Sequence, residues 1–169
     1  MKFVLLLLVC LLDLSAPDLP SLRNILDQSF SNQKAANAFY EQMKGVKDAD
    51  LPVMSGFRAM SEFMLCKHLL NPFSRINHFN RGRKLLESAI ARDRDSPELL
   101  FFRLTTQSNV PALLNYSGNI KGDTQNLISY LETAQDKIHT DKDLHKRIKS
   151  YLLISQYCSA EEKALITRL

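Results

Sequence analysis

The stretch PVMSGFRAMSEFMLCKHLL, residues 52–70, decides the fold. Its apolar residues fall on two sides of a helix, with Val53, Phe57, Met60 and Met64 on one side and Ala59, Phe63, Cys66 and Leu70 on the other. Apolar residues three and four positions apart indicate a helix, and two apolar sides indicate a helix that is covered twice. Ser55, Arg58 and Glu62 form the only polar stripe, in which Arg58 and Glu62 are spaced for an ion pair. The stretch therefore predicts a central helix.

The rest of the chain repeats this pattern in segments separated by turn residues. We expect about eight helices, of which seven begin near Pro20, Gln33, Pro52, Asn71-Pro72, Ser96-Pro97, Asp123-Thr124 and Ser159. The remaining one, the seventh along the chain, is defined by Leu144, Ile148, Tyr151 and Leu152. Proline is tolerated at the first helical position because its missing amide would have no partner there, and Ser159 and Glu162 have capping-box spacing. The predicted fold class is all-α, built from antiparallel helical hairpins.

The first sixteen residues have the pattern of a secretory signal peptide. Lys2 precedes the apolar run of residues 3–12, and Ala16 stands where a peptidase would cut. At about 1.5 Å per residue, this run is too short to cross a hydrocarbon core of about 30 Å. We expect a signal peptide at 1–16, a single α-helical domain at 17–169, and a periplasmic or secreted location. A packed N-terminal helix and an uncleaved signal, the only membrane contact we expect, are the alternatives.

Cysteine and charge narrow the class of protein. Cys66 and Cys158 lie inside apolar helical segments, which favours buried free thiols over one disulfide. Residues 67–103 hold eight Lys and Arg against four acids and so carry the whole formal net charge of +4. We interpret this basic segment as a solvated helix face and expect no nucleic-acid partner, because its aromatics sit at core spacing.

No catalytic motif occurs in the chain. The four histidines fall on different segments, and there is no Gly-rich phosphate loop, Gly-x-Ser-x-Gly or His-Glu-x-x-His. His139 and His145 flank two aspartates, but a pair at a helix junction is more typical of solvated turn residues than of a metal site. We therefore expect no enzyme activity, no catalytic residue, no metal and no cofactor.

The segment 103–123 is the candidate binding site, because core packing explains it least. Arg103 and Gln107 lie one helical turn apart, and Asn109, Tyr116 and Asn119 follow in or beside a polar loop. A planar guanidinium suits a carboxylate or the C-terminus of a partner. The favoured alternative is that Arg103 and Gln107 bond main-chain carbonyls and merely hold the loop in place.

Two sets of residues in the sequence resemble known protein families. Gly82, Leu86 and Ala89, with the run 90–98, resemble the second helix and inter-repeat turn of a tetratricopeptide repeat. The likeness covers one helix and one turn, departs from the family at Arg94, and has no second copy at a 34-residue period. It implies a divergent array of hairpins.

The run from the signal segment through 84–87, 104–111 and 116–120 resembles an uncharacterised exported helical family of Bacteroidota. This second likeness implies an envelope setting in a Gram-negative bacterium and supplies no activity.

The expected function is a protein-interaction module that holds a protein or peptide partner in the groove between stacked hairpins. One alternative is a small-ligand-binding protein or enzyme that uses the Arg103, Gln107 and Tyr116 loop. Another is a purely structural envelope protein.

Deleting residues 2–16 tests the signal-peptide hypothesis. We expect the shortened chain to keep its helical circular dichroism spectrum and to accumulate in the cytoplasm, because the body contains its own core. Loss of helicity would show instead that the apolar run belongs to that core.

Overall fold

The computed structural model describes residues 18–134 and 141–169. These residues form eight α-helices and one 3-10 turn: α1 Leu19–Ser31, α2 Gln33–Met43, α3 Pro52–His68, α4 Pro72–Arg92, α5 Pro97–Asn109, η1 Ala112–Leu114, α6 Ile120–Ala134, α7 Lys142–Ile154 and α8 Ala160–Arg168. The described residues contain no strand, which confirms the all-α prediction. None of the helices among them is both long and apolar enough to cross a membrane.

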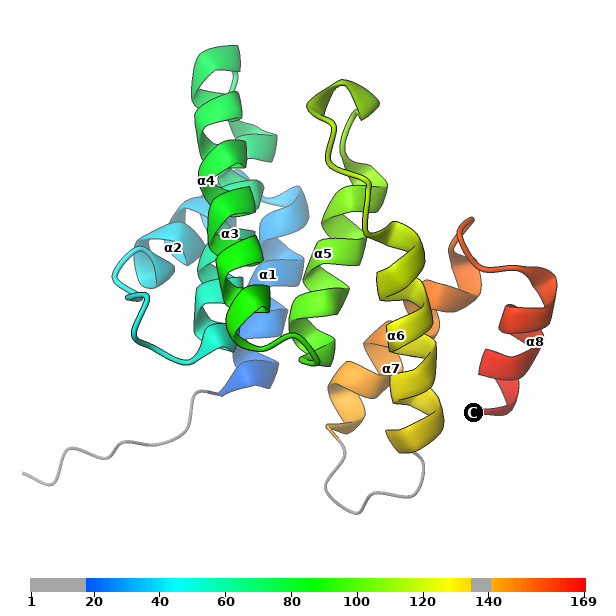
Figure 1. Cartoon of the computed structure of the whole chain (residues 1–169). Helices are drawn as coiled ribbons and strands as arrows, with labels where there is room; N and C mark the ends of the chain where they lie inside the picture. The colour runs from blue at the N-terminus through cyan, green and yellow to red at the C-terminus, as the bar shows by residue number, and fades with distance from the viewer. Residues whose placement is uncertain (1–17, 135–140) are drawn as a thin grey trace, which may run out of the picture.

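The helices pack as successive hairpins (Figure 1). Helices α1 to α4 form one side of the molecule, α6 to α8 form the other, and α5 lies between them. Helix α3 contacts α1, α2, α4 and α5, so the prediction of a central helix covered from two sides is confirmed. The hairpin array places α5 in contact with α3, α4 and α6.

Local sequence explains most helix starts. Proline occupies the first turn of α1, α3, α4 and α5. The Asn32 and Asn71 side chains accept hydrogen bonds from the first amides of α2 and α4. Ser159 and Glu162 form the predicted capping box at α8. Each cap satisfies amides that have no partner inside their own helix.

Ser96 takes the N-cap position of α5 that the sequence predicts, although its side chain makes no cap hydrogen bond. Two other local predictions were wrong. Helix α6 begins at Ile120 rather than at Asp123, because the Asp123 amide already donates to the Asn119 carbonyl. Glu62 is buried and binds His78 of α4 instead of Arg58.

Arg58 donates to the main-chain oxygen of Val46 at 2.7 Å. The signal segment 1–16 and residues 135–140, which contain most of the predicted end of α6 and His139, lie outside the described residues.

Cys66 and Cys158 are free thiols, as expected. Cys158 is buried, whereas Cys66 is only half-buried. Burial raises the pKa of both thiols above the ordinary value for cysteine.

Gly82 sets the distance between α3 and α4. A Cβ atom at this position would lie 2.8 Å from the Phe63 ring and 3.1 Å from the main-chain oxygen of Ala59. The main-chain oxygen belongs to a helix and cannot move aside alone. Gly82 therefore permits a close approach of α4 to α3.

Gly82→Ala should lower the free energy of unfolding by about 1–3 kcal/mol, the usual cost of overpacking a core. The matched control is Gly122→Ala in α6, where a Cβ would meet no atom within 4 Å. That control should be neutral or stabilising by up to about 1 kcal/mol, because alanine favours the helix. Equal stability of the two variants in urea titrations would contradict the close-approach argument.

A cleft over α5 as the candidate binding site

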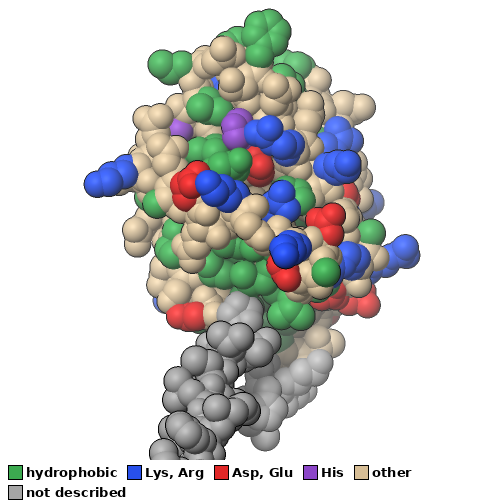
Figure 2. All heavy atoms as spheres, turned by 90° about the vertical axis from the view of Figure 1, so that its left-hand side faces the viewer, with side chains coloured by type: hydrophobic (Ala, Val, Ile, Leu, Met, Phe, Trp, Pro, Cys, Tyr) green, Lys and Arg blue, Asp and Glu red, His purple; other side chains and the backbone are tan. Residues whose placement is uncertain are grey.

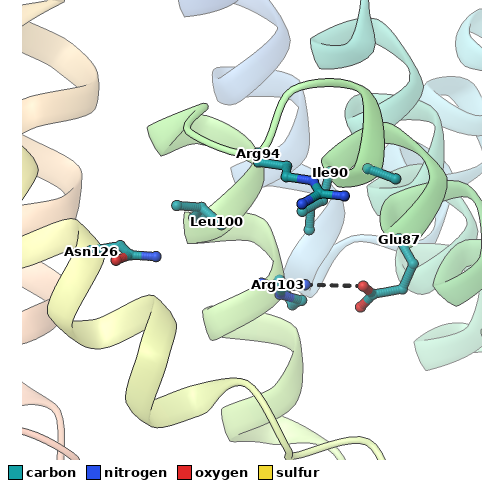
Figure 3. A pocket seen from close by; sticks show the side chains of 7 residues that line it. Glu87, Ile90, Arg94, Leu100, Arg103 and Asn126 are labelled. Atoms are coloured by element: carbon teal, nitrogen blue, oxygen red, sulfur yellow. Dashed lines mark hydrogen bonds and ion pairs between the residues drawn. The ribbon is translucent and has the colours of Figure 1, made fainter.

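A cleft of about 320 Å³ opens between α4, α5 and α6. Helix α5 forms its floor with Leu100 and Arg103, while α4 and the turn after it form one wall and α6 the other (Figure 3). The lining residues are Glu87, Ile90, Ala91, Arg94, Leu100, Arg103 and Asn126. The cleft therefore combines an apolar floor with polar groups from three elements, the composition typical of binding sites.

Two exposed polar side chains at the cleft have no bonding partner among the described residues. Arg94 lies in the turn between α4 and α5, and Asn126 lies on α6. In Figure 3 the Asn126 amide points into the cleft from one wall, and the Arg94 guanidinium lies above Arg103 from the other. Both groups are free to bind a ligand or partner.

Arg103 is the charged group in the floor, and its side chain is already paired. Its Nε and Nη2 donate to the two carboxylate oxygens of Asp123 at 2.8 and 2.7 Å, and Nη1 donates to Glu87 at 3.0 Å. Burial alone would lower the pKa of this guanidinium, but Asp123 and Glu87 outweigh that effect and raise the pKa. Arg103 thus remains a permanent cation that fixes α5 to α6 and α4.

Glu87 links Arg103 to Tyr116. The Tyr116 hydroxyl donates to Glu87 Oε1 at 2.7 Å, while Arg103 binds Oε2. Burial raises the Tyr116 pKa, and the nearby Glu87 charge raises it further. The Tyr116 ring also packs edge-on to Phe79 at 5.9 Å and lies 4.8 Å from the Arg83 guanidinium. Tyr116 therefore serves as a neutral donor that holds the loop against α4.

The other predicted site residues lie beyond the cleft lining. Gln107 Nε2 donates to Asn119 Oδ1 at 3.2 Å, and the main-chain N–H of Asn119 donates to Gln107 Oε1 at 3.1 Å. Asn109 donates to the Thr105 carbonyl within its own helix at 2.7 Å. The structure thus brings Arg103 and Tyr116 together through Glu87, joins Gln107 to Asn119, and leaves Asn109 apart.

The expectation that Arg103 bonds main-chain carbonyls was wrong. Its partners are the carboxylates of Asp123 and Glu87, because a cation that is 9% exposed needs counter-charges to offset lost hydration. Sequence reasoning missed these two acids, and it missed Arg94 and Asn126 at the rim. The sequence does contain a signal for an acidic partner, because an arginine on a helix as apolar as α5 requires a counter-charge.

A second buried cluster ties α1 to α5 and α7. Arg23 is 2% exposed and its Nε donates to both oxygens of Glu98 at 3.1 and 3.0 Å. It also donates to Asp141 at 2.7 Å and to Asp143 at 2.9 Å. Burial raises the Glu98 pKa despite the arginine, whereas the Arg23 bonds hold the Asp141 pKa below its usual value against the opposing effect of burial. Because its donors are taken, this cluster is a structural connection.

A third buried carboxylate, Glu62 of α3, binds His78 Nδ1 at 2.6 Å and Arg81 Nε at 3.3 Å. The two described ranges, 18–134 and 141–169, contain no group of three or more His, Cys, Asp or Glu side chains placed to hold a metal ion.

Comparison of the chain with protein-family models, curated proteins and solved structures found no match. Functional inference therefore rests on the residues of the chain itself.

Arg103→Ala should lower the free energy of unfolding by about 3–5 kcal/mol, because it leaves the Asp123 carboxylate buried without a counter-ion. Arg94→Ala, at the rim of the same cleft, should change stability by less than about 0.5 kcal/mol. Urea denaturation followed by circular dichroism measures both values. A stable Arg103→Ala variant would show that its ion pairs do not hold α5, α4 and α6 together.

Proposed function

We propose that the chain is a protein-interaction module whose cleft over α5 binds an acidic segment of a partner protein. The observation that carries the proposal is the pairing pattern of the lining residues. Arg103 and Glu87 are bound to residues of the protein, whereas Arg94 and Asn126 have no partner among the described residues. A carboxylate is the group that the free guanidinium of Arg94 binds best.

The cleft also offers apolar surface close to the charge of Arg94. Leu100 is 4% exposed and Ile90 is 6% exposed, so both present small patches of side chain at the base of the cleft. The cleft volume of about 320 Å³ suits one or two partner side chains rather than a folded element. An anchor of this kind, an apolar side chain next to a carboxylate, concentrates binding energy at a few central contacts.

Arg103 acts in this proposal as a positioning residue. Its bonds to Asp123 and Glu87 fix the separation of α6 and α4 and hence the width of the cleft. Because Glu87 accepts from both Arg103 and Tyr116, its charge is offset and does not oppose an incoming carboxylate. The only unpaired cation among the lining residues is Arg94.

A small carboxylate ligand is the second candidate. The cleft volume lies near the lower limit of about 300 Å³ for small-molecule sites, which favours a compact acid. This candidate shares the Arg94 anchor and differs in needing no flanking chain. It does not bind the Arg103 guanidinium, because Nε and Nη2 of Arg103 already donate to Asp123.

The envelope location belongs to the same proposal. Lys2 and the apolar run of residues 3–12 support export, and a docking role without bond cleavage suits a chain that carries no catalytic motif.

The test is selection of peptides from a random displayed library against the full chain, followed by fluorescence anisotropy with the selected peptides. We expect the peptides to share an acidic residue or free C-terminus next to an apolar residue. Arg94→Ala should weaken binding about tenfold or more, because hydrogen bonds to charged groups are worth about 1.5–3 kcal/mol.

The matched control is Arg168→Ala, an exposed arginine on α8 outside the cleft, which should bind with unchanged affinity. Binding of short acids such as succinate with the same Arg94 dependence, and no peptide enrichment, would favour the small-ligand candidate. Peptide binding that ignores Arg94 would overturn the cleft assignment.

A further inference from the structure

The exposed apolar side chains gather at one end of the helical array. Among the described residues, eight large hydrophobic side chains are exposed, and seven lie in or next to the turns that join α1 to α2, α3 to α4, α5 to α6 and α7 to α8: Phe30, Leu70, Phe73, Ile76, Leu113, Ile154 and Tyr157. We call these four turns the hairpin-turn end. Figure 1 shows the α3–α4 and α5–α6 turns projecting at the top of the molecule.

Contacts between the turns confirm that three of them share one end. Lys67 near the end of α3 lies 3.0 Å above the Phe30 ring at the end of α1. His68 contacts the Ser29 main-chain oxygen at 2.8 Å. The loop after α5 packs on α4, because the Tyr116 ring meets Phe79 at 5.9 Å.

Three of the highly exposed members stand on the two projecting turns. Leu70 is 97% exposed, Phe73 is 77% exposed and Leu113 is 85% exposed. Such side chains gain nothing from the fold, since each remains almost wholly in water. Isolated exposed leucines are common, but a group confined to one end indicates a surface that is covered in use.

Charged residues are also distributed unevenly between the two ends of the helical array. Residues 28–40, 63–86 and 99–122, which span the first three turns and the helix ends around them, contain no aspartate or glutamate. Their Lys and Arg residues are Lys34, Lys67, Arg75, Arg81, Arg83, Lys84, Arg103 and Lys121. The opposite turns carry the acids Asp48, Asp50, Asp93 and Asp95 beside the bases Lys44, Lys47, Arg92 and Arg94, so their charges cancel.

Among the bases around the first three turns, Arg81 binds Glu62, and Arg103 binds Asp123 and Glu87. The other six have no acidic partner among the described residues, so the first three turns of the hairpin-turn end are basic and apolar together.

Figure 2 shows the side of the molecule that carries α2, α3 and α4. Apolar side chains stand at the top of that face with no acidic side chain among them, whereas basic and acidic side chains lie together farther down, beside a further apolar area.

We infer that the hairpin-turn end docks onto an anionic phospholipid bilayer. Apolar side chains on projecting turns enter the interface of headgroups and acyl chains, while surrounding lysines and arginines bind the anionic headgroups. A bilayer fits better than an acidic protein, because the exposed residues sit on several separate projections rather than in one groove. The inference is independent of the cleft, which lies between α4, α5 and α6 and has its free arginine in an opposite turn.

Tryptophan fluorescence tests the contact at single positions, because the chain contains no tryptophan. Phe73→Trp places the probe on the α3–α4 turn. Leu51→Trp places it at the opposite end, where Leu51 is the one large exposed hydrophobic among the described residues. Full-length variants are mixed with vesicles of phosphatidylglycerol and phosphatidylcholine, or of phosphatidylcholine alone. Because each probe reports its own surroundings, membrane insertion of residues 3–12 does not mimic the signal.

We expect a blue shift of Phe73→Trp emission, and quenching by brominated lipids, with the phosphatidylglycerol vesicles only. Leu51→Trp should show neither change. Lys67→Glu with Arg75→Glu should lower the apparent vesicle affinity of the Phe73→Trp probe at least about tenfold, since each basic residue near the surface adds to the attraction. Lys44→Glu with Lys47→Glu, the same change of charge at the opposite end and outside the cleft, should leave that affinity unchanged.

An unshifted Phe73→Trp spectrum with both vesicle types would overturn the inference. So would an equal response at position 51 or an equal response to phosphatidylcholine alone. A blue shift that grows with protein concentration in the absence of lipid would instead identify a second copy of the chain as the occupant. Peptide binding in the cleft is measured separately, so either proposal can fail without the other.

Discussion

Helix α5 carries two buried charges of opposite sign, and their pairing holds the two sides of the molecule together. Glu98, in its first turn, accepts from Arg23 of α1, which also binds the first residues of α7. Arg103, more than one turn later, binds Asp123 of α6 and Glu87 of α4. Helices α1, α4 and α6 are therefore tied to α5 by ion pairs, and α7 is tied to it indirectly through Arg23. Each pair costs desolvation and has only one matching geometry. A shift of α5 along its axis would separate both pairs at once, so these contacts fix its position more sharply than its apolar side chains do.

Apolar packing holds the other helices together, and it places neighbouring helices in close contact. Gly82 brings α4 so close to α3 that the Phe63 ring fills the space of a missing Cβ. Helix α3 is thus covered by α2 and α4 through tight packing and joined to α5 through aromatic contact, with the Phe57 and Phe102 rings 4.9 Å apart. The cleft lies between α4, α5 and α6, where the paired Arg103 side chain forms part of the floor.

The sequence predicts elements well where one residue decides a local geometry. Pro52 at the start of α3 and the Ser159 and Glu162 capping box depend only on neighbouring amides, so both were confirmed. It fails where tertiary packing decides which partner a charged residue binds. Arg58 and Glu62 have ideal spacing for a pair, yet Glu62 faces α4 and binds His78, because tertiary contacts set which side of α3 is buried. Asp123 was missed for the same reason, because its pairing with Arg103 depends on the packing of α6 on α5.

The two proposed surfaces lie at different ends of the array, and this separation has a mechanical consequence. Arg94 lies in the turn between α4 and α5, whereas Leu70 and Phe73 lie at the other end of α4, which is 21 residues long. At about 1.5 Å per residue, that helix spans roughly 30 Å, about the width of a small domain. A chain that rests on a bilayer through Leu70 and Phe73 would therefore hold the Arg94 rim well above the headgroups, beyond a Debye length of about 8 Å. An acidic partner could then reach the cleft without repulsion from the anionic lipid, so docking and partner binding would be compatible on one molecule.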